Sequence, residues 1–129
     1  TLRTSSAASD VYKRQENGQK VSESNWKNGK QDGLKTEWHK NGRKESEGNW
    51  KNDKQEGLLT AWYENGQKRT EINYKNGKKE ELQTRWHENG QKRSEVNWVD
   101  GKVDGVVTFW DKEGDVTQTD TYKDGKLVK

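Results

Sequence analysis

A 24-residue repeat runs through the chain from residue 16 and constrains its fold more than any other feature. Aromatic residues recur in two series that share this step and are offset from each other by half of it. One series is Trp38, Trp62, Trp86 and Trp110, and the other is Trp26, Trp50, Tyr74, Trp98 and Tyr122. Repeats of roughly 20–50 residues are typical of arrays in which each unit packs on its neighbours. The chain is therefore predicted to be a linear array and not a globule with one large core.

Each repeat unit has the pattern of two short strands and two tight turns. Between the turns, alternate residues share one character, as in Leu58, Thr60 and Trp62, and Asn-Gly pairs stand at 28–29 and 41–42. These features are typical of β-hairpins, whereas Gly or Asn at intervals of a few residues disfavours helix. We predict an all-β fold: an elongated single-layer antiparallel β-meander of hairpin repeats, extending about 45–50 Å.

The length of the hairpin loops decides which residues share a face of this sheet. A two-residue loop at 41–42 would place Thr36 opposite Glu47. A three-residue loop with Gly42 in a left-handed conformation would place Thr36 opposite Ser46 instead. The second register pairs like residues with like, so we predict three-residue loops at both turns of each unit. The like-with-like pairs are Thr36–Ser46, Thr60–Thr70, Thr84–Ser94, Leu58–Ile72 and Leu82–Val96.

This register predicts a single aromatic face. It sets a lysine opposite most of the aromatic residues, as in Trp38–Lys44 and Trp26–Lys30, and gathers Leu and Thr on the same face. Cross-strand pairs of this kind are worth about 0.2–1 kcal/mol each. The face is a candidate both for the small core of such a fold and for a partner-binding surface. Its residues are Trp26, Trp38, Trp50, Trp62, Tyr74, Trp86, Trp98 and Trp110.

The first 15 residues do not carry the repeat. Ser5–Gln15 reads SSAASDVYKRQ, which resembles an in-frame translation of an adapter used to build sequencing libraries. We therefore predict that residues 1–15 are a non-native, disordered segment. Residues 16–129 are predicted to form the repeat array, of about four and a half units. The native start would then be missing, which leaves the localisation open between the cytoplasm and the cell envelope.

Charge and composition narrow the possible partners. The chain has 25 basic and 22 acidic residues, of which residues 1–15 hold three and one, so the rest carries a net charge of +1. A small net charge with interleaved signs does not indicate nucleic-acid binding and gives little support for binding acidic lipid headgroups. The chain has no cysteine and no apolar run long enough for a membrane-spanning helix. Since only 24% of the residues are hydrophobic, a conventional enzyme with a large core is not expected.

No pattern in the sequence indicates catalysis, a metal or a cofactor. His39 and His87 occupy the same repeat position but would lie four strand steps apart, roughly 19 Å. We interpret them as solvent-face residues and not as metal ligands. Glutamates at 23, 47, 71 and 95 would form a solvated column with ion pairs, in which Glu71 faces Glu81. We predict that the chain is not an enzyme.

The two half-motifs of the unit resemble the bacterial variant of the MORN repeat. They stand here as Trp62-Tyr-Glu-Asn-Gly-Gln-Lys68 with Glu71, and as Trp26-Lys-Asn-Gly-Lys30 with Gly33. The resemblance covers everything after residue 15 and implies a fold of β-hairpin repeats without a catalytic motif. Proteins similar to this one are often grouped as antitoxins of the YwqK type, which implies that they neutralise a partner toxin by binding it.

Two functions from different classes stay open at this point. The first is a non-catalytic scaffold for protein–protein interaction, whose partner is a toxin or a component of the cell envelope. The second is a cell-envelope repeat protein that binds glycans or lipid headgroups through its aromatic face. Self-association through that face is compatible with both.

Overall fold

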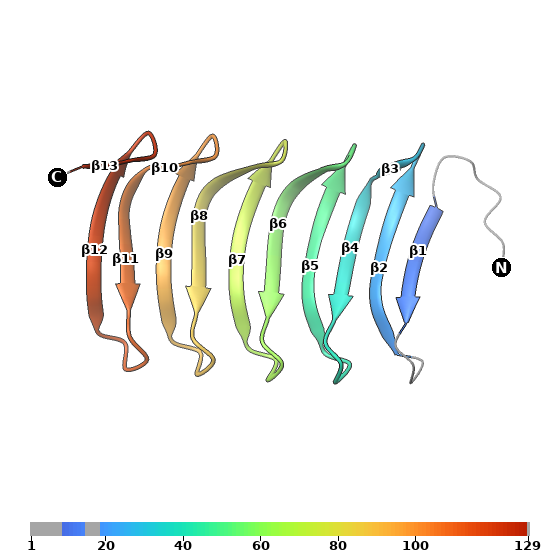
Figure 1. Cartoon of the computed structure of the whole chain (residues 1–129), viewed down its shortest axis with the longest axis horizontal. Coiled ribbons are helices and arrows are strands. Elements are labelled where there is room, and N and C mark those ends of the chain that lie inside the picture. Colours follow the sequence, from blue (N-terminus) through green and yellow to red (C-terminus); the bar gives the residue numbers. More distant parts are fainter. Residues whose placement is uncertain (1–8, 15–18, 129) are drawn as a thin grey trace.

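The computed structural model describes residues 9–14 and 19–128, which form one antiparallel sheet (Figure 1). The strands are β1 (Ser9–Arg14), β2 (Lys20–Lys27), β3 (Lys30–Gln31), β4 (Gly33–Trp38), β5 (Lys44–Lys51), β6 (Lys54–Trp62), β7 (Lys68–Lys75), β8 (Lys78–Trp86), β9 (Lys92–Val99), β10 (Lys102–Val103), β11 (Gly105–Trp110), β12 (Val116–Lys123) and β13 (Lys126–Val128). They lie side by side in the order β1-β2-β4-β5-β6-β7-β8-β9-β11-β12-β13, while β3 pairs with β2 and β10 pairs with β9.

The predicted all-β, single-layer antiparallel meander is confirmed. Strands that follow one another in the sequence are neighbours in the sheet, and no second layer built from the described residues covers either face (Figure 1). Equivalent strands recur at the predicted step, as β6 (Lys54–Trp62) and β8 (Lys78–Trp86) show. Residues 9–14 and 19–128 contain no helix that is long and apolar enough to cross a membrane.

The turns after the Trp38 series have the predicted three-residue geometry. At the first of them the N–H of Gly42 donates to the carbonyl of His39 (3.0 Å), and the N–H of His39 donates to the carbonyl of Arg43 (2.8 Å). Gly42 has a φ of 86°, in the left-handed region that glycine adopts without steric cost. Trp38 is consequently opposite Lys44, as predicted.

A β-bulge just beyond each of these turns reverses the rest of the predicted register. Between the pairs Trp38–Lys44 and Glu37–Ser46, residue Glu45 has no partner of its own. Because side chains alternate along a strand, this one extra residue changes which side chains oppose one another from there on. The predicted like-with-like pairs are therefore wrong. In place of Thr36–Ser46, Thr60–Thr70, Thr84–Ser94, Leu58–Ile72 and Leu82–Val96, the structure has Thr36–Glu47, Thr60–Glu71, Thr84–Glu95, Leu58–Asn73 and Leu82–Asn97.

The second series of turns departs from the prediction in a different way. Asn28 and Gly29 both have a positive φ, 51° and 77°, which is the signature of a two-residue turn of type I′. Such a turn matches the twist of the strands that it joins, which is why Asn-Gly favours it. Trp26 therefore lies opposite Gln31 and not opposite Lys30, as the three-residue loop had predicted. The equivalent pairs are Trp50–Gln55, Tyr74–Lys79 and Trp98–Val103.

The observed register divides the side chains into two faces. The Glu71 face carries the glutamate column, the threonines paired with it, an aliphatic row and one aromatic series: Glu23, Glu47, Glu71, Glu95, Thr36, Thr60, Thr84, Thr108, Leu34, Leu58, Leu82, Val106, Trp38, Trp62, Trp86 and Trp110. The Ile72 face carries a central row of mostly small or apolar residues and the other aromatic series: Ser24, Gly48, Ala61, Ile72, Gln83, Ser94, Val107, Trp26, Trp50, Tyr74 and Trp98.

The buried core is a single row along the middle of the Ile72 face. Ile72 is 2% exposed, and the other buried hydrophobic residues are Ala61 and Val107. On the Glu71 face Thr36 and Thr84 are buried, but the aliphatic row is exposed. So thin a core means that each repeat is held mainly by its two neighbours, as in other linear arrays.

Glu81 occupies a backbone position where other units have glycine. Its φ is 66°, and Gly57, one unit earlier, has a φ of 82°. Glu81 lies opposite Trp98, so the predicted opposition of Glu81 to Glu71 is wrong. This position is distinguished by a non-glycine residue whose backbone is left-handed, and not by repulsion between like charges.

We expect Glu81→Gly to raise the free energy of unfolding by about 0.5–1 kcal/mol, the relieved strain less the entropy that glycine costs through the unfolded chain. Urea denaturation at low and at high salt measures the change. The gain should be equal at both salt concentrations, because it comes from the backbone. A gain that disappears at high salt would assign the effect to charge instead.

The N-terminal strand differs from the disorder predicted for residues 1–15. Residues 9–14 form β1, which runs antiparallel to β2 with Ser9 opposite Trp26 and Lys13 opposite Ser22. An unpaired edge strand presents free N–H and C=O groups, and pairing with them depends on backbone and not on repeat motifs. Residues 1–8 and 15–18 lie outside the described residues, and the non-native origin of the segment stays a prediction.

Candidate functional site

The aromatic residues that were predicted to share one face are divided between two. The ammonium of Lys68 is 2.6 Å from the carboxylate of Glu71 and 5.8 Å from the ring centre of Trp86, so these three side chains lie on one face. The indole N–H of Trp98 donates to Gln83 (2.9 Å) on the Ile72 face. The bulge and the two-residue turns cause this division, since together they alter the register that had aligned the two series. The Glu71 face has Trp38, Trp62, Trp86 and Trp110, and the Ile72 face has Trp26, Trp50, Tyr74 and Trp98.

Lysines lie over aromatic rings of the Glu71 face. The ammonium of Lys20 is 5.6 Å from the ring centre of Trp38 and 2.7 Å from the carboxylate of Glu23. The same arrangement recurs at Lys68 and Lys92. These pairs are partly exposed, so each contributes at most about 1 kcal/mol. Their main consequence is that one side of the rings of Trp38, Trp86 and Trp110 is covered and that the glutamates are paired with lysines.

An aliphatic row crosses the Glu71 face without cover from the described residues. Leu34, Leu58, Leu82 and Val106 stand at one repeat position and are 41%, 47%, 48% and 56% exposed. Successive members lie two strands apart, about 9–10 Å. Asparagines face the three leucines on the neighbouring strands, which gives the row a polar border. Sequence reasoning missed this surface, because the predicted register paired Leu58 with Ile72.

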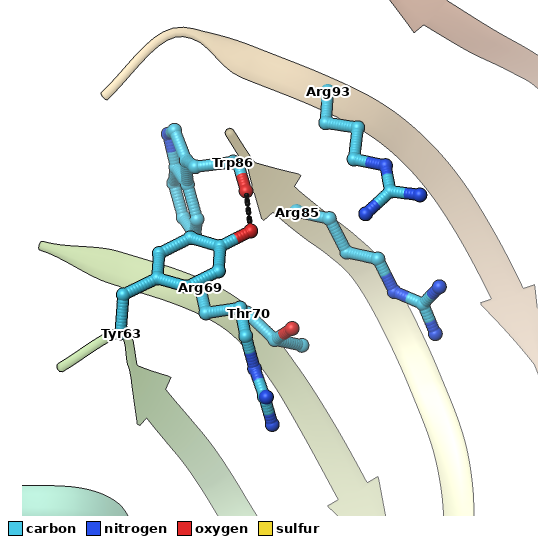
Figure 2. A pocket seen from close by; sticks show the side chains of 6 residues that line it. All are labelled: Tyr63, Arg69, Thr70, Arg85, Trp86 and Arg93. Atoms are coloured by element: carbon cyan, nitrogen blue, oxygen red, sulfur yellow. Dashed lines mark hydrogen bonds between the residues drawn. The ribbon is translucent and has the colours of Figure 1, made fainter. Parts of the chain in front are cut away.

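Three hollows share Tyr63 in their linings and have volumes of about 410, 490 and 500 Å³. Arg85 lines the first and lies opposite Thr70 on one side and Ser94 on the other, which places it on the Ile72 face. Arg69 and Arg93 are the bulged residues of β7 and β9, equivalent to Glu45 in β5. No motif marks this cluster in the sequence. The first hollow is lined by Tyr63, Arg69, Thr70, Arg85, Trp86 and Arg93 (Figure 2).

Comparison with known families agrees with this architecture. Residues 31–52, 55–76 and 82–100 match the family described as MORN repeat variant. The chain contains MORN-variant repeats. MORN repeats are non-catalytic scaffolds that bind proteins or membranes. No curated protein matches the chain.

Side-chain hydrogen bonds couple each MORN-variant repeat to the next. The hydroxyl of Tyr63 donates to the carbonyl of Trp86 (2.6 Å; Figure 2), and Nε2 of His39 lies 2.8 Å from the carbonyl oxygen of Trp62. His87 makes the same contact as His39 two repeats later, with Nε2 2.9 Å from the carbonyl oxygen of Trp110. The two histidines are partly buried, so the prediction that they are solvent-face residues is wrong. This repeat position joins neighbouring MORN-variant units through hydrogen bonds.

The asparagines of the turns also serve the contacts between repeats. The side-chain N–H of Asn65 donates to the carbonyl of Glu88 in the next turn (3.0 Å), while its Oδ1 accepts the N–H of Gln67 (3.0 Å). At the opposite edge the N–H of Gly77 donates to the carbonyl of Gln55 (2.9 Å). The Asn-Gly pairs of the MORN-variant unit thus shape the turn and bind the neighbouring turn.

Several acidic side chains in the described part of the MORN-variant array lie close to lysines. No group of three or more His, Asp or Glu side chains among those residues is placed to hold a metal ion. Glu47 is 2.7 Å from Lys44, and Lys35 lies 4.0 Å from Glu37. The exposed features of these residues are the aliphatic row of the Glu71 face and the arginines of the first hollow.

Proposed function

We propose that the chain is a non-catalytic scaffold that binds a protein partner through the aliphatic row of the Glu71 face, and that this partner is a toxin that the chain neutralises. One observation carries the proposal. Leu34, Leu58, Leu82 and Val106 are exposed on a sheet face that no other described segment covers. A leucine that a partner buried completely would contribute about 1.5–3 kcal/mol, so a few members suffice for specific binding.

The same face favours a protein over a glycan. Sugars that stack on aromatic rings need an uncovered ring face, and lysines lie over Trp38, Trp86 and Trp110. The leucines provide none of the hydrogen bonds that a sugar requires. An apolar row bordered by asparagines instead has the composition of a protein interface, with an apolar centre and a polar rim.

The toxin is the more specific part of the proposal, and it is supported by the resemblance of the half-motifs, such as that from Trp62 to Lys68, to those of antitoxins. A neutralising partner needs a preformed surface that holds its shape. The hydrogen bonds from Asn65 and Tyr63 to the next repeat support such a surface, because they fix successive units relative to each other. A second copy of the chain is the competing occupant of the row.

The test is a calorimetric titration of the purified chain with the purified product of the gene next to its own. We expect a one-to-one complex. The double variant Leu58→Gln, Leu82→Gln should weaken it at least about tenfold, because two apolar contacts at the centre of the interface are lost. Circular dichroism should show an unchanged fold, since both side chains are about half exposed.

Val99→Gln is the matched control, because Val99 is 48% exposed but lies at the end of β9, beside a turn. It should change the affinity less than about threefold, within the range of surface substitutions. Failure of the neighbouring gene product to bind would contradict the proposal that the partner is a toxin. If the double variant still binds the partner normally, the aliphatic row is not the binding site. If light scattering shows a dimer that is lost when Leu58 and Leu82 are replaced, the row serves self-association instead.

A further inference from the structure

Three arginines on neighbouring strands line one hollow and have no partner among the described residues. Arg69, Arg85 and Arg93 come from β7, β8 and β9, and all three are exposed. Within residues 9–14 and 19–128 none of them makes an ion pair or a side-chain hydrogen bond. Glu64 and Glu88 line the adjoining hollows, but their carboxylates are not within 4.0 Å of these guanidinium groups.

The cluster is a feature of this part of the array and not of the repeat. The position of Arg69 and Arg93 is held by Glu45 in β5, and the position of Arg85 is held by Ala61 in β6. At the equivalent bulge of β5 the carboxylate of Glu45 lies 3.3 Å from Nδ1 of His39. Three like charges on adjacent strands repel one another unless an anion lies among them. The uncompensated positive charge therefore marks a place where an external anion would bind.

The shape of the hollow favours an extended anion over a small one. Arg69 and Arg93 start two strands apart, about 9–10 Å, and in Figure 2 the three guanidinium groups are spread out and do not meet at one point. The hydroxyl of Tyr63 is engaged with the carbonyl of Trp86. A single phosphate would thus reach only part of the cluster. Acidic side chains on one face of an extended peptide lie about 6.6–6.8 Å apart, a spacing that spans the three arginines with two or three carboxylates.

We propose that Arg69, Arg85 and Arg93 bind an acidic segment of a protein, with its Asp or Glu carboxylates held by the guanidinium forks. This inference rests on the proposed function as a protein-binding scaffold and adds a second, electrostatic site on the opposite face from the aliphatic row. Arginine suits the role, because its planar fork pairs with a carboxylate through two parallel hydrogen bonds.

Fluorescence anisotropy with a labelled ten-residue peptide that has Glu at every second position tests the site. A peptide with Gln in place of every Glu is the reference, and the salt concentration is about 50 mM, at which exposed charges still interact over about 10 Å or more. We expect the Glu peptide to bind at least about tenfold more tightly than the Gln peptide. Arg85→Gln should weaken binding about threefold or more, and Arg69→Gln with Arg93→Gln about tenfold or more.

Two further variants separate the site from net charge. Arg85→Lys keeps the charge and should still lose at least about half of the affinity, because the fork is lost. Lys123→Gln removes one exposed charge at the far edge of β12 and should leave the affinity within about 1.5-fold. Equal losses for Lys123→Gln and Arg85→Gln would overturn the proposal, as would equal binding of the two peptides.

Two other probes test for other anions. In the first, inorganic phosphate is added at the same concentration as the carboxylates of the peptide. Displacement of the peptide under this condition would overturn the preference for an extended acidic segment. Vesicles containing phosphatidylserine that bind through the same arginines, without peptide binding, would assign the cluster to a membrane instead. Leu58→Gln with Leu82→Gln should bind the peptide normally, so failure of the partner titration and failure of this site are separate results.

Discussion

Ile72→Ala is expected to lower the free energy of unfolding by about 2–4 kcal/mol, the usual cost of emptying a buried isoleucine site. Ile72 is 2% exposed and lies opposite Leu59 in the middle of the array. Few apolar side chains of the sheet are buried, and no second layer of described residues covers it. No neighbouring group can therefore move in to fill the cavity that the substitution leaves. Urea denaturation followed by circular dichroism measures the change.

Leu58→Ala provides the matched comparison. Leu58 is on β6, next to Leu59, but points to the other face and is 47% exposed. Its truncation should cost less than about 1 kcal/mol, because it is solvated in the folded chain. Similar costs for Ile72→Ala and Leu58→Ala would mean that the two residues share a face, as the three-residue loops had predicted.

Trp98→Ala is expected to cost about 3–4 kcal/mol, because it removes an aromatic ring and a partly buried hydrogen bond together. The ammonium of Lys79 is 4.5 Å from the ring centre of Trp98, and the indole N–H donates to Oε1 of Gln83 (2.9 Å). Gln83 is 5% exposed, so the amide oxygen would lose its partner in a place that water reaches poorly. Trp98→Phe keeps a ring and should cost about 1–2 kcal/mol.

Trp50→Phe separates the hydrogen bond from the ring. Trp50 occupies the equivalent repeat position, but there the residue equivalent to Gln83 is Lys35, which has no acceptor. Its replacement by Phe should therefore cost less than about 1 kcal/mol. The difference between the two Trp→Phe variants in chemical denaturation measures the Gln83 bond, and equal values would contradict its contribution.

The architecture could be predicted from the sequence because it depends on periodicity alone. The two aromatic series and the Asn-Gly pairs imposed hairpins with a fixed step, and the meander follows from hairpins in succession. The geometry around Gly42 could be predicted as well, since a type I turn followed by a left-handed glycine is a common three-residue loop. These features are local, so the residues that decide them are adjacent in the chain.

The register could not be predicted from pair preferences. Each cross-strand pair contributes only a small free energy, whereas one bulge changes the partner of every residue beyond it. The extra residue at Glu45 shifts the partner of Thr36 by one position, and no side-chain type at 45, 69 or 93 signals it. At Asn28–Gly29 a signal was present, since Asn-Gly is the strongest indication of a two-residue type I′ turn. Applying it there would have placed Trp26 opposite Gln31.

Both candidate surfaces depend on that register, which is why sequence reasoning found neither. The predicted face combined Leu58 with Ile72 and with all the aromatic residues, so the leucines did not stand out as a separate row. The observed register separates the leucines from Ile72 and exposes them. It also brings Arg69 and Arg93 beside Arg85, although the three are scattered among other charges in the sequence. The composition of a repeat reveals its faces only once the bulges are known.

The division of the sheet into a Glu71 face and an Ile72 face is the central claim, and engineered disulfides test it most directly. The chain has no cysteine of its own, so each pair can be studied against a clean background. In the observed register Thr60 and Glu71 are directly opposite, at a distance of about 4.5–5.5 Å between Cα atoms, which a disulfide spans. Thr60→Cys with Glu71→Cys should oxidise readily in the folded chain, as mass spectrometry of a digest would show. Thr60→Cys with Thr70→Cys should stay reduced, because those side chains point to opposite faces; rapid oxidation of this second pair in place of the first would contradict the account.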